Sequence, residues 1–505
     1  MVQMQEDRSD SPLTIGLDIG TTNIKGAAFT LHGTAVAAAS VPTVSHSPRP
    51  GWTSYRPAEM WEAAVRVIRT IAGQIEAPER IAGIAVASMA EAGVLLDARG
   101  EPVSDIIAWF DRRSAPQLAW LTDTIGADRL TRITGLVPDA KFSLSKLLWH
   151  RAEEPEVFSR ARRWLHLADF IAYRLCGVPA TDWSLASRTL AFDLRALRWS
   201  DEILDAAVIP TALLAPSVAS GTPIGRVRSD AGALTGLPAG CTVATGGHDH
   251  LCGALAVGIT LPGAMLDSLG TAEALLICTD RPVDAPAVAE AGYNQGAHVA
   301  RGMFYVNGSV QSFGRSLDSL RALTGPEATL ETLLAEAASV PPGAQGVRYL
   351  PHRLPAGAVD IDSRSGGMLT GPVDGATPAV IARSVLEGLA FAARSGFEPL
   401  AALNGREQFP EITVIGGGAR NELLLRIKAA VMRTTLRVPD VREAAALGAA
   451  MLAAIGAGLF IDVADALRQI QPDVCLIEPD PTWMDAYARI YEQSFRPMSA
   501  EGFQP

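Results

Sequence analysis

The chain has 505 residues, more than one hydrophobic core usually organises, so two domains are the first expectation. Its formal net charge of −11 argues against nucleic acid or an anionic membrane surface as a partner. The five cysteines are scattered without paired spacing, which argues against a disulfide framework or a cysteine metal site and favours a reducing, cytoplasmic location.

The N-terminal part of the chain is predicted to form a short extension followed by a β-hairpin. Residues 1–12 are polar and acidic, unlike a signal peptide, and are expected to be disordered. Residues 14–29 read TIGLDIGTTNIKGAAF and place strand-like segments on both sides of Gly20, which allows the backbone to turn. Asp18 lies near the end of the first strand. The turn is filled by the polar residues Thr21, Thr22 and Asn23.

This hairpin has the chemistry of a phosphate site. Its turn directs several N–H and O–H donors at one place, as a polyphosphate requires. Asp18 beside the turn is a candidate ligand for the Mg²⁺ that accompanies a nucleotide, through water because Mg²⁺ dehydrates reluctantly. On these residues alone, an ordinary hairpin with a surface aspartate explains the pattern equally well.

A second segment of the same design favours the phosphate interpretation. Residues 264–276 read AMLDSLGTAEALL, again an apolar strand, an aspartate, a Gly-Thr turn and a second strand. Gly270 and Thr271 form that turn. Two such hairpins half a chain apart predict two related domains that face each other across a nucleotide.

The elements after the first hairpin agree with this architecture. A third strand is predicted over 35–40, a helix begins at Pro57, and an apolar strand covers 81–87. Three strands, a helix and a strand open a ribonuclease H-like domain, the unit shared by actin, hexokinase and related ATPases. We therefore expect an α/β protein with two ribonuclease H-like domains and a cleft between them.

Several segments resemble a known family in the same order along nearly the whole chain. They are DIGTTNIKG in the first hairpin, AWFDRR (108–113), TGLVPDAKFSLSKLLW (134–149), TDWSLASRT (181–189), GGHDH (246–250), DSLGT (267–271), GGGARNELLLRIKA (416–429) and EAAALGAA (443–450). With these segments the sequence resembles the FGGY family of carbohydrate kinases. The resemblance implies ATP and Mg²⁺ as cofactors and a small sugar or polyol as substrate. Dimers are common in that family, so a homodimer is possible.

The domain borders follow from the same segments. We expect an N-terminal domain over 13–256 with the sugar site, a C-terminal domain over 257–461 with the nucleotide site, and a helical tail over 462–505. Residues 444–461 carry no charge, but they are mostly Ala and Gly, so a core helix is favoured over a membrane span.

Asp249 is the candidate catalytic base. A strand over 241–245, a Gly-Gly turn and a helix over 251–256 place it at a helix N-terminus, where the dipole favours its ionised form. From the residues alone, a simple N-cap is the stronger interpretation. The resemblance reverses this, because the family's base occupies this aspartate. Phosphoryl transfer depends mainly on positioning and charge neutralisation, so a raised pKa is not required.

Three further residues are candidates for the sugar site. Glu91 matches a position that binds substrate hydroxyls in the glycerol kinase branch, although the neighbouring Arg of that branch is Ala90 here. His250 is a candidate partner of a substrate hydroxyl, or a histidine at a helix start without a partner. Lys141 replaces a sugar-facing Tyr and is either a solvated lysine or a partner of an acidic or ketone oxygen. His248 and His250 lack a third ligand at useful spacing, which argues against zinc.

The nucleotide is expected near a glycine run between a strand and a helix. Gly residues there allow close approach of the backbone, and the helix N-terminus favours phosphate. Glu443 is interpreted as a helix cap rather than a ligand. Residues 349–355 depart from the family's usual stretch, so their loop geometry is open. The resemblance assigns the adenosine to Gly417, Gly418 and Asn421, the phosphates to Thr21, Thr22 and Thr271, and a nearby position to Gln311.

The sequence thus predicts an ATP-dependent kinase that phosphorylates a hydroxyl of a small sugar, ketose or polyol, with Asp249 as base. A sugar acid is an alternative substrate. Two other protein classes remain: a sugar-responsive binding protein without catalysis, and an ATPase of the chaperone or actin type.

Overall fold

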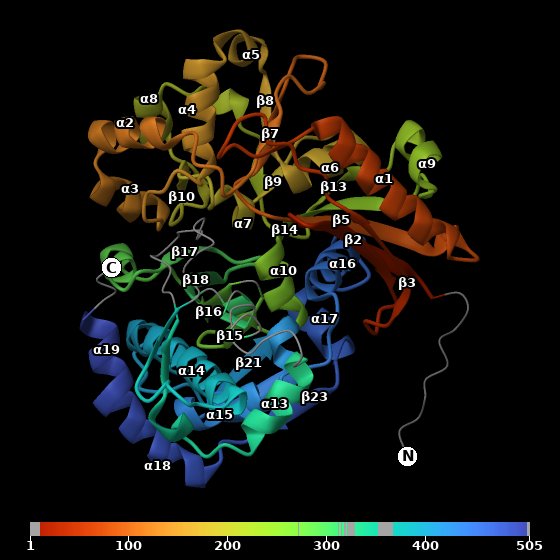
Figure 1. The fold of residues 1–505 in the computed structure, drawn as a ribbon. Helices are drawn as coiled ribbons and strands as arrows, with labels where there is room; N and C mark the ends of the chain where they lie inside the picture. The colour runs from red at the N-terminus through yellow and green to blue at the C-terminus, as the bar shows by residue number, and fades with distance from the viewer. Residues whose placement is uncertain are drawn as a thin grey trace.

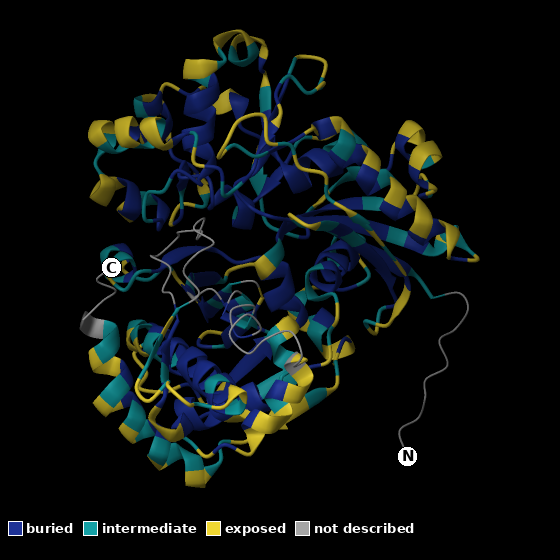
Figure 2. Ribbon diagram, viewed as in Figure 1, coloured by how far each residue is buried: buried dark blue, intermediate teal, exposed yellow. Residues whose placement is uncertain are grey.

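The computed structural model describes residues 11–270, 272–311, 313–314, 316–317, 320, 329–351 and 367–501, and shows two α/β domains (Figure 1). The predicted disordered extension therefore lies outside the described residues, except for residues 11 and 12. Buried residues are concentrated in the two sheets and in the helices that cover them (Figure 2).

The first domain is built on a six-stranded sheet with the order β13-β14-β5-β1-β2-β3. β1 and β2 form the predicted antiparallel hairpin, and β5 and β14 run parallel to β1. The strands are β1 (Leu13–Ile19), β2 (Asn23–Phe29), β3 (Ala35–Pro42), β5 (Ile81–Ser88), β13 (Pro223–Arg226) and β14 (Thr242–His248).

The second domain repeats this topology in a seven-stranded sheet with the order β17-β18-β16-β15-β21-β22-β23. β15 and β16 form the second predicted hairpin, and β21 and β22 run parallel to β15. The strands are β15 (Met265–Leu269), β16 (Glu273–Thr279), β17 (Asn294–Ala297), β18 (Phe304–Gln311), β21 (Glu411–Ile415), β22 (Thr435–Pro439) and β23 (Val474–Ile477).

The two sheets match strand for strand from β3 to β13 and from β18 to β23. In each, the first three strands are antiparallel neighbours, the next two are parallel to the first, and an antiparallel edge strand follows. The prediction of two related α/β domains, made from the likeness of the two hairpins, is confirmed.

Helices cover both sheets. In α1 (Pro57–Gly73) apolar residues recur at helical spacing and are buried, and the helix packs against β2 and β3; they include Trp61, Ala64, Ile68 and Ile71. Pro57 fits the first turn because its missing N–H needs no partner there. α14 (Pro378–Leu403) packs on the second sheet. The other α-helices of the described residues are α2 (Ala115–Ile125), α3 (Ala127–Thr134), α4 (Ser143–Glu153), α5 (Pro155–Arg160), α6 (Leu167–Cys176), α7 (Trp183–Ala186), α8 (Asp201–Ala207), α9 (Ser229–Thr235), α10 (Asp249–Ala256), α11 (Ala285–Glu290), α13 (Leu330–Ala338), α15 (Glu422–Met432), α16 (Ala444–Gly456), α17 (Val463–Gln469), α18 (Pro481–Ile490) and α19 (Arg496–Glu501).

The Ala-rich helix α16 is a core helix, as predicted, but it packs on the first sheet. It lies beside α10, and the two helices share one apolar cluster with residues of both sheets (Figure 1). Small side chains are required there, because helix and strand backbones approach closely. From its position in the chain, the sequence predicts this helix within the second domain, over 257–461.

The tail over 462–505, which the sequence predicts to be helical, also contains a strand. Within it, β23 pairs with β22 and extends the second sheet, and only then do α18 and α19 follow. The segment is short and is preceded by a helix, so its pattern alone did not identify it as an edge strand.

The contact between α16 and β1 gives a stability prediction. A Cβ atom at Gly16 would overlap the carbonyl oxygen of Ala446 in α16, and both are backbone positions that cannot rotate away. We expect Gly16→Ala to lower the free energy of unfolding by about 3 kcal/mol or more, the upper range for overpacking. Urea denaturation measures the change. Gly73→Ala is the matched control: it meets no atom within 4 Å at the end of α1 and should be neutral or stabilising by about 0.5–1 kcal/mol. Equal effects of the two substitutions would contradict the proposed packing.

Candidate functional site

Three acidic residues lie at one end of the first sheet. Asp18 is near the end of β1, Glu91 follows β5, and Asp249 follows β14. These strands are parallel neighbours whose last residues lie opposite one another in the sheet register. The carboxyl ends of parallel strands are where α/β proteins usually bind ligands. Three of the predicted site residues are thus brought together by the strand order.

Asp249 is the first residue of α10, while His248 occupies the N-cap position without capping through its side chain. Asp249 therefore does not serve as the N-cap. Its Oδ1 accepts from the backbone N–H of His250 at 2.6 Å and lies 3.2 Å from His248 Nε2. Burial holds the pKa of His248 well below its usual value, so a neutral imidazole lies beside the carboxylate. The hydrogen bond from the His250 backbone orients Asp249.

Two of the carboxyl groups titrate near neutral pH. Burial raises the pKa of Asp249 to about 7, partly offset by the hydrogen bond from the His250 backbone. Burial, followed by the charge of Asp249, also raises the pKa of Asp18 to about 7. The helix dipole was expected to favour the ionised form of Asp249, but burial outweighs it. A change of charge near either carboxyl group therefore changes the fraction of that group that is ionised at neutral pH.

Glu91 is held from both its side chain and its backbone. It is buried, its φ of 61° lies in the left-handed region, and Oε1 accepts from Arg188 Nε at 2.8 Å and lies 2.5 Å from Arg188 Nη2. Lys146 is buried and donates to the carbonyl oxygens of Glu91 and Ala108, both at 2.9 Å. Strained backbone of this kind is found where a side chain must be aimed.

Sequence reasoning did not select Arg188 or Lys146. Both belong to segments that carried the family resemblance, so the region was identified but the individual side chains were not. Arg188 lies 97 positions from Glu91, and no local pattern connects residues at that separation.

Lys141 and His250 lie in the same region. Lys141 is buried, so it is not a solvated lysine; burial, and then the charge of Arg188, lower its pKa to about 8. His250 is exposed as a whole residue, and burial by the surrounding protein lowers its pKa, followed by the charge of Arg188. The structure therefore brings all four predicted sugar-site residues near the carboxyl ends of β5 and β14.

The glycine run lies against the second hairpin, as a shared nucleotide site requires. Gly416 has a φ of 95°, and a Cβ there would lie 2.5 Å from the carbonyl oxygen of Leu269 at the end of β15. Gly417 and Gly418 follow in a short 3₁₀ helix; Gly417 is exposed, as is Gly270, and Gly418 is half-buried. The backbones of the two turns are thus adjacent and accessible.

The other predicted phosphate residues are placed as follows. Thr21 and Thr22 are exposed in the first hairpin turn, and Asn23 begins β2. Thr271 lies outside the described residues. Gln311 ends β18, opposite Glu273 in the register, and its side chain lies outside the described part of the structure.

One prediction about a helix cap is wrong, and one predicted neighbour of the adenosine has a structural role as well. Asn421, which was predicted to border the adenosine, also caps α15, because its Oδ1 accepts from the backbone N–H of Leu424 at 3.1 Å. Glu443 occupies the N-cap position of α16, but its carboxylate does not cap and lies 3.3 Å from Lys25 Nζ instead. Of the unusual stretch 349–355, the first residues end β19 (Arg348–Leu350), and 352–355 lie outside the described residues.

A buried charged cluster connects the second hairpin to α15. Lys428 Nζ contacts Asp267 Oδ2 of β15 and lies 2.6 Å from Glu273 Oε1 of β16. All three side chains are buried. Burial raises the pKa of Asp267 to about 7 despite Lys428. The lysine therefore fixes both strands of the hairpin to the helix that follows the glycine run.

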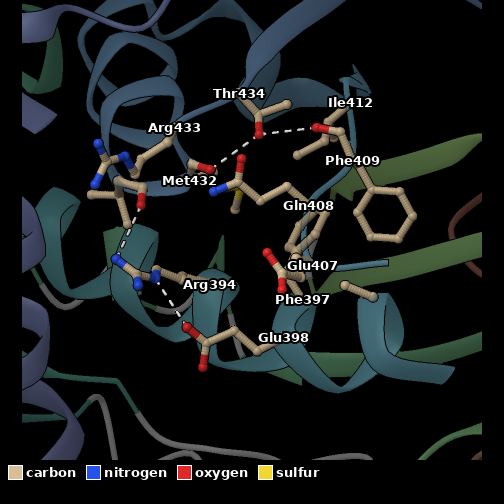
Figure 3. A pocket seen from close by; sticks show the side chains of 12 residues that line it. Arg394, Phe397, Glu398, Glu407, Gln408, Phe409, Ile412, Met432, Arg433 and Thr434 are labelled. Carbon is tan, nitrogen blue, oxygen red and sulfur yellow. Dashed lines mark hydrogen bonds and ion pairs between the residues drawn. The ribbon is translucent and has the colours of Figure 1, made fainter. Parts of the chain in front are cut away.

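A separate pocket in the second domain contains none of the predicted residues. It lies beside α14 and α15 and offers about 90 Å³ of space to water-sized molecules (Figure 3). Two of its polar side chains bond within the protein: Arg394 Nε donates to Glu398 at 3.1 Å and Thr434 Oγ1 to the Phe409 carbonyl at 3.2 Å. We therefore assign it no role in the reaction.

The described residues contain neither a membrane-spanning helix nor a ready-made metal cluster. No helix in that part of the chain is long and apolar enough to cross a membrane. No group of three or more His, Cys, Asp or Glu side chains there is arranged to hold a metal ion on its own.

Comparisons with known proteins agree with this architecture. Residues 13–256 match the model of the FGGY family of carbohydrate kinases, N-terminal domain, and residues 265–457 match the model of its C-terminal domain. The chain is 28% identical over 482 residues to a xylulose kinase of Lactococcus lactis, with 95% of each chain covered. It is 31% identical over 455 residues to a glycerol kinase of Gloeobacter violaceus, with 89% of each covered.

Solved structures give the same result. The xylulose kinase from Rhodospirillum rubrum is 30% identical and superposes with a TM-score of 0.87, covering 97% of this chain and 98% of that one. The xylulose kinase from Brucella ovis is 26% identical and has a TM-score of 0.86.

Proposed function

This chain belongs to the FGGY family of carbohydrate kinases, and on that premise we propose that it transfers a phosphoryl group from ATP to one hydroxyl of a small polyhydroxy compound, with Asp249 as general base. The enzyme is an ATP-dependent carbohydrate kinase; its acceptor and the roles of its residues are the proposal. The observation that carries it is the meeting of Asp18, Glu91 and Asp249 at neighbouring strand ends.

Asp249 accepts the proton of the reacting hydroxyl. The hydroxyl oxygen forms a bond to the γ-phosphorus, the bond from that phosphorus to the bridging oxygen breaks, and ADP leaves. The backbone N–H of His250 donates to Oδ1 and leaves the second carboxylate oxygen for the substrate. Because proton transfer is late in such reactions, holding this carboxylate in place matters more than its basicity.

Asp18 is the proposed residue for Mg²⁺. Its Oδ1 is buried and has no hydrogen-bond partner among the described residues, which is unusual for a carboxylate and suits a cation or its bound water. Mg²⁺ neutralises phosphate charge when bound. Burial raises the pKa of Asp18 to about 7. A neighbouring cation would lower this pKa and so favour the ionised carboxylate.

The two hairpin turns and the glycine run are the proposed nucleotide site. Thr21, Thr22 and Asn23 supply donors from the first turn, and Gly270 with Thr271 from the second. Gly417 and Gly418 leave room for the adenosine, and Gln311 and Asn421 border it. The contact of Gly416 with Leu269 supports this arrangement, since it brings the glycine run to the second turn.

Glu91 and His250 are proposed to bind acceptor hydroxyls, since a carboxylate accepts from two hydroxyls and imidazole can donate or accept. The relatives are named for xylulose and for glycerol, and both compounds are small and polyhydroxylated.

We propose domain borders at 13–256 and 257–461 with a tail from 462, with α16 packed across the border.

The decisive test is ADP release, measured by a coupled assay over tetritols, pentitols, ketopentoses, ketohexoses and sugar acids. Turnover on one class identifies the acceptor. Silence over the whole panel, with sugar binding still visible as a thermal shift, would contradict the kinase proposal and favour a sugar-responsive binding protein.

The reaction should depend on pH through Asp249. Burial raises the pKa of this group to about 7, and only the ionised form accepts a proton. We expect kcat/KM to rise with pH up to about 7 and to level off above it, measured from pH 5.5 to 9 with saturating Mg²⁺ and ATP. A profile that stays flat between pH 6 and 8 would contradict this assignment.

A further inference from the structure

Two cationic side chains lie against the same aromatic ring, that of Phe142, in the predicted sugar site. Arg188 Cζ lies 5.1 Å and Lys141 Nζ 5.2 Å from the centre of the Phe142 ring. Both side chains are buried, with relative exposures of 7% for Arg188 and 8% for Lys141. Buried cations are unfavourable unless anionic or hydrogen-bonding groups surround them.

Glu91 satisfies only part of Arg188. Its Oε1 receives both contacts of that guanidinium, from Nε at 2.8 Å and from Nη2 at 2.5 Å. The third nitrogen, Nη1, is buried and has no hydrogen-bond partner among the residues that the structure describes. Tyr305 is the other neighbour of this guanidinium, but its buried hydroxyl also makes no hydrogen bond of suitable geometry among the described residues, so Nη1 keeps a donor for an added acceptor.

Arg188 lies near the catalytic base. It contacts Glu91, which follows β5, and Asp249 follows the neighbouring parallel strand β14. Its charge lowers the pKa of Asp249, which burial raises to about 7, and after burial Arg188 and Lys141 both lower the pKa of His248. A short substrate with a hydroxyl at Asp249 would extend toward them. The charge of Arg188 also lowers the pKa of Lys141, an effect that a bound anion would reverse.

We propose that the acceptor is a sugar acid whose carboxylate binds between Arg188 Nη1 and Lys141 Nζ while one of its hydroxyls faces Asp249. This inference rests on the kinase function proposed above. Arginine and lysine together are the usual partners of a carboxylate, the first for its fixed donor geometry and the second as a point charge. The carboxylate keeps its charge throughout, because the bond to phosphorus forms at the hydroxyl oxygen and the proton goes to Asp249.

Matched acceptors test this on the full-length enzyme. ADP release would be compared for erythronate and erythritol, ribonate and ribitol, xylonate and xylitol, gluconate and glucitol, and for xylulose and ribulose. We expect the best acid to exceed its polyol in kcat/KM by about 100-fold or more. Preference for a polyol or ketose would overturn the sugar-acid inference and leave the kinase proposal intact. Silence on every compound would overturn both.

A variant separates binding from folding. Lys141→Met should raise KM for the acid by about 100-fold, with a smaller change in kcat, and should lower kcat/KM for the acid at least about tenfold more than for the matching polyol. Lys141→Arg keeps the charge and should recover part of the loss. An equal loss on acid and polyol with an unchanged melting temperature would contradict a carboxylate site at Lys141.

Discussion

Asp249→Asn is expected to lower kcat by about 100- to 10,000-fold, the range that a positioned general base contributes. The amide has nearly the same shape as the carboxylate but cannot accept the proton of the substrate hydroxyl. Binding of acceptor and nucleotide should change little, because Glu91, Arg188 and the hairpin turns remain. KM for ATP should therefore stay within about threefold of the wild-type value.

Two measurements make this prediction specific. The residual activity of the variant should lack the rise of kcat/KM near pH 7. Its loss would show that the rise comes from Asp249, since burial raises the pKa of this group to about 7. Asp205→Asn, an exposed position in α8, is the matched control and should leave kcat unchanged. Wild-type turnover by the Asp249 variant would remove this residue from the mechanism.

Lys428→Met is expected to have the largest effect on stability. It leaves the carboxylates of Asp267 and Glu273 buried without their cation, a change that usually costs about 3–5 kcal/mol of unfolding free energy. Arg426→Met on the same helix is the control: Arg426 is exposed, lies 4.0 Å from Asp480, and should cost less than about 1 kcal/mol. Urea denaturation at fixed pH measures both.

The pH dependence of this loss has a definite sign. Burial already raises the pKa of Asp267 to about 7, above its value of about 4 in an unfolded chain, and removal of Lys428 raises it further. A group with a raised folded pKa stabilises most below its unfolded pKa and loses that contribution as pH rises. The loss should therefore be greater at pH 8 than at pH 5.5.

A triple variant identifies the cause. Combining Lys428→Met with Asp267→Asn and Glu273→Gln removes all three charges, so most of the stability should return. If the triple variant were no more stable than the single one, lost packing rather than uncompensated charge would explain the effect.

Local patterns were sufficient to predict the elements that are apolar and regular. The two hairpins, α1, β5 and α16 follow from alternation, helical spacing and turn residues that act within a few positions. The repeat of one hairpin design also predicted two related domains, because equal local sequences favour equal local structures. The short strand β23 was missed, since its pairing with β22 depends on a partner 35 or more positions away.

In the candidate site, too, residues at the ends of strands and helices were predictable, and contacts between distant segments were not. Asp18, Glu91 and Asp249 could be selected because each ends a strand or begins a helix, and the family resemblance gave them roles. Glu443 was assigned a local role as a cap, but its carboxylate turns to Lys25 on a distant strand. Local propensity could not anticipate that choice, because an ion pair between separate segments exists only after folding.

The sequence by itself determined the fold class, the family and the segments that carry the chemistry, since these depend on short-range patterns and on motif order. Only the tertiary structure decided which side chains act together. Arg188 meets Glu91 across 97 positions and Lys428 meets Glu273 across 155, and both pairs are buried. Their energies and the raised pKa values of Asp18 and Asp249 arise from exclusion of water, which no short segment achieves before the sheets and helices pack.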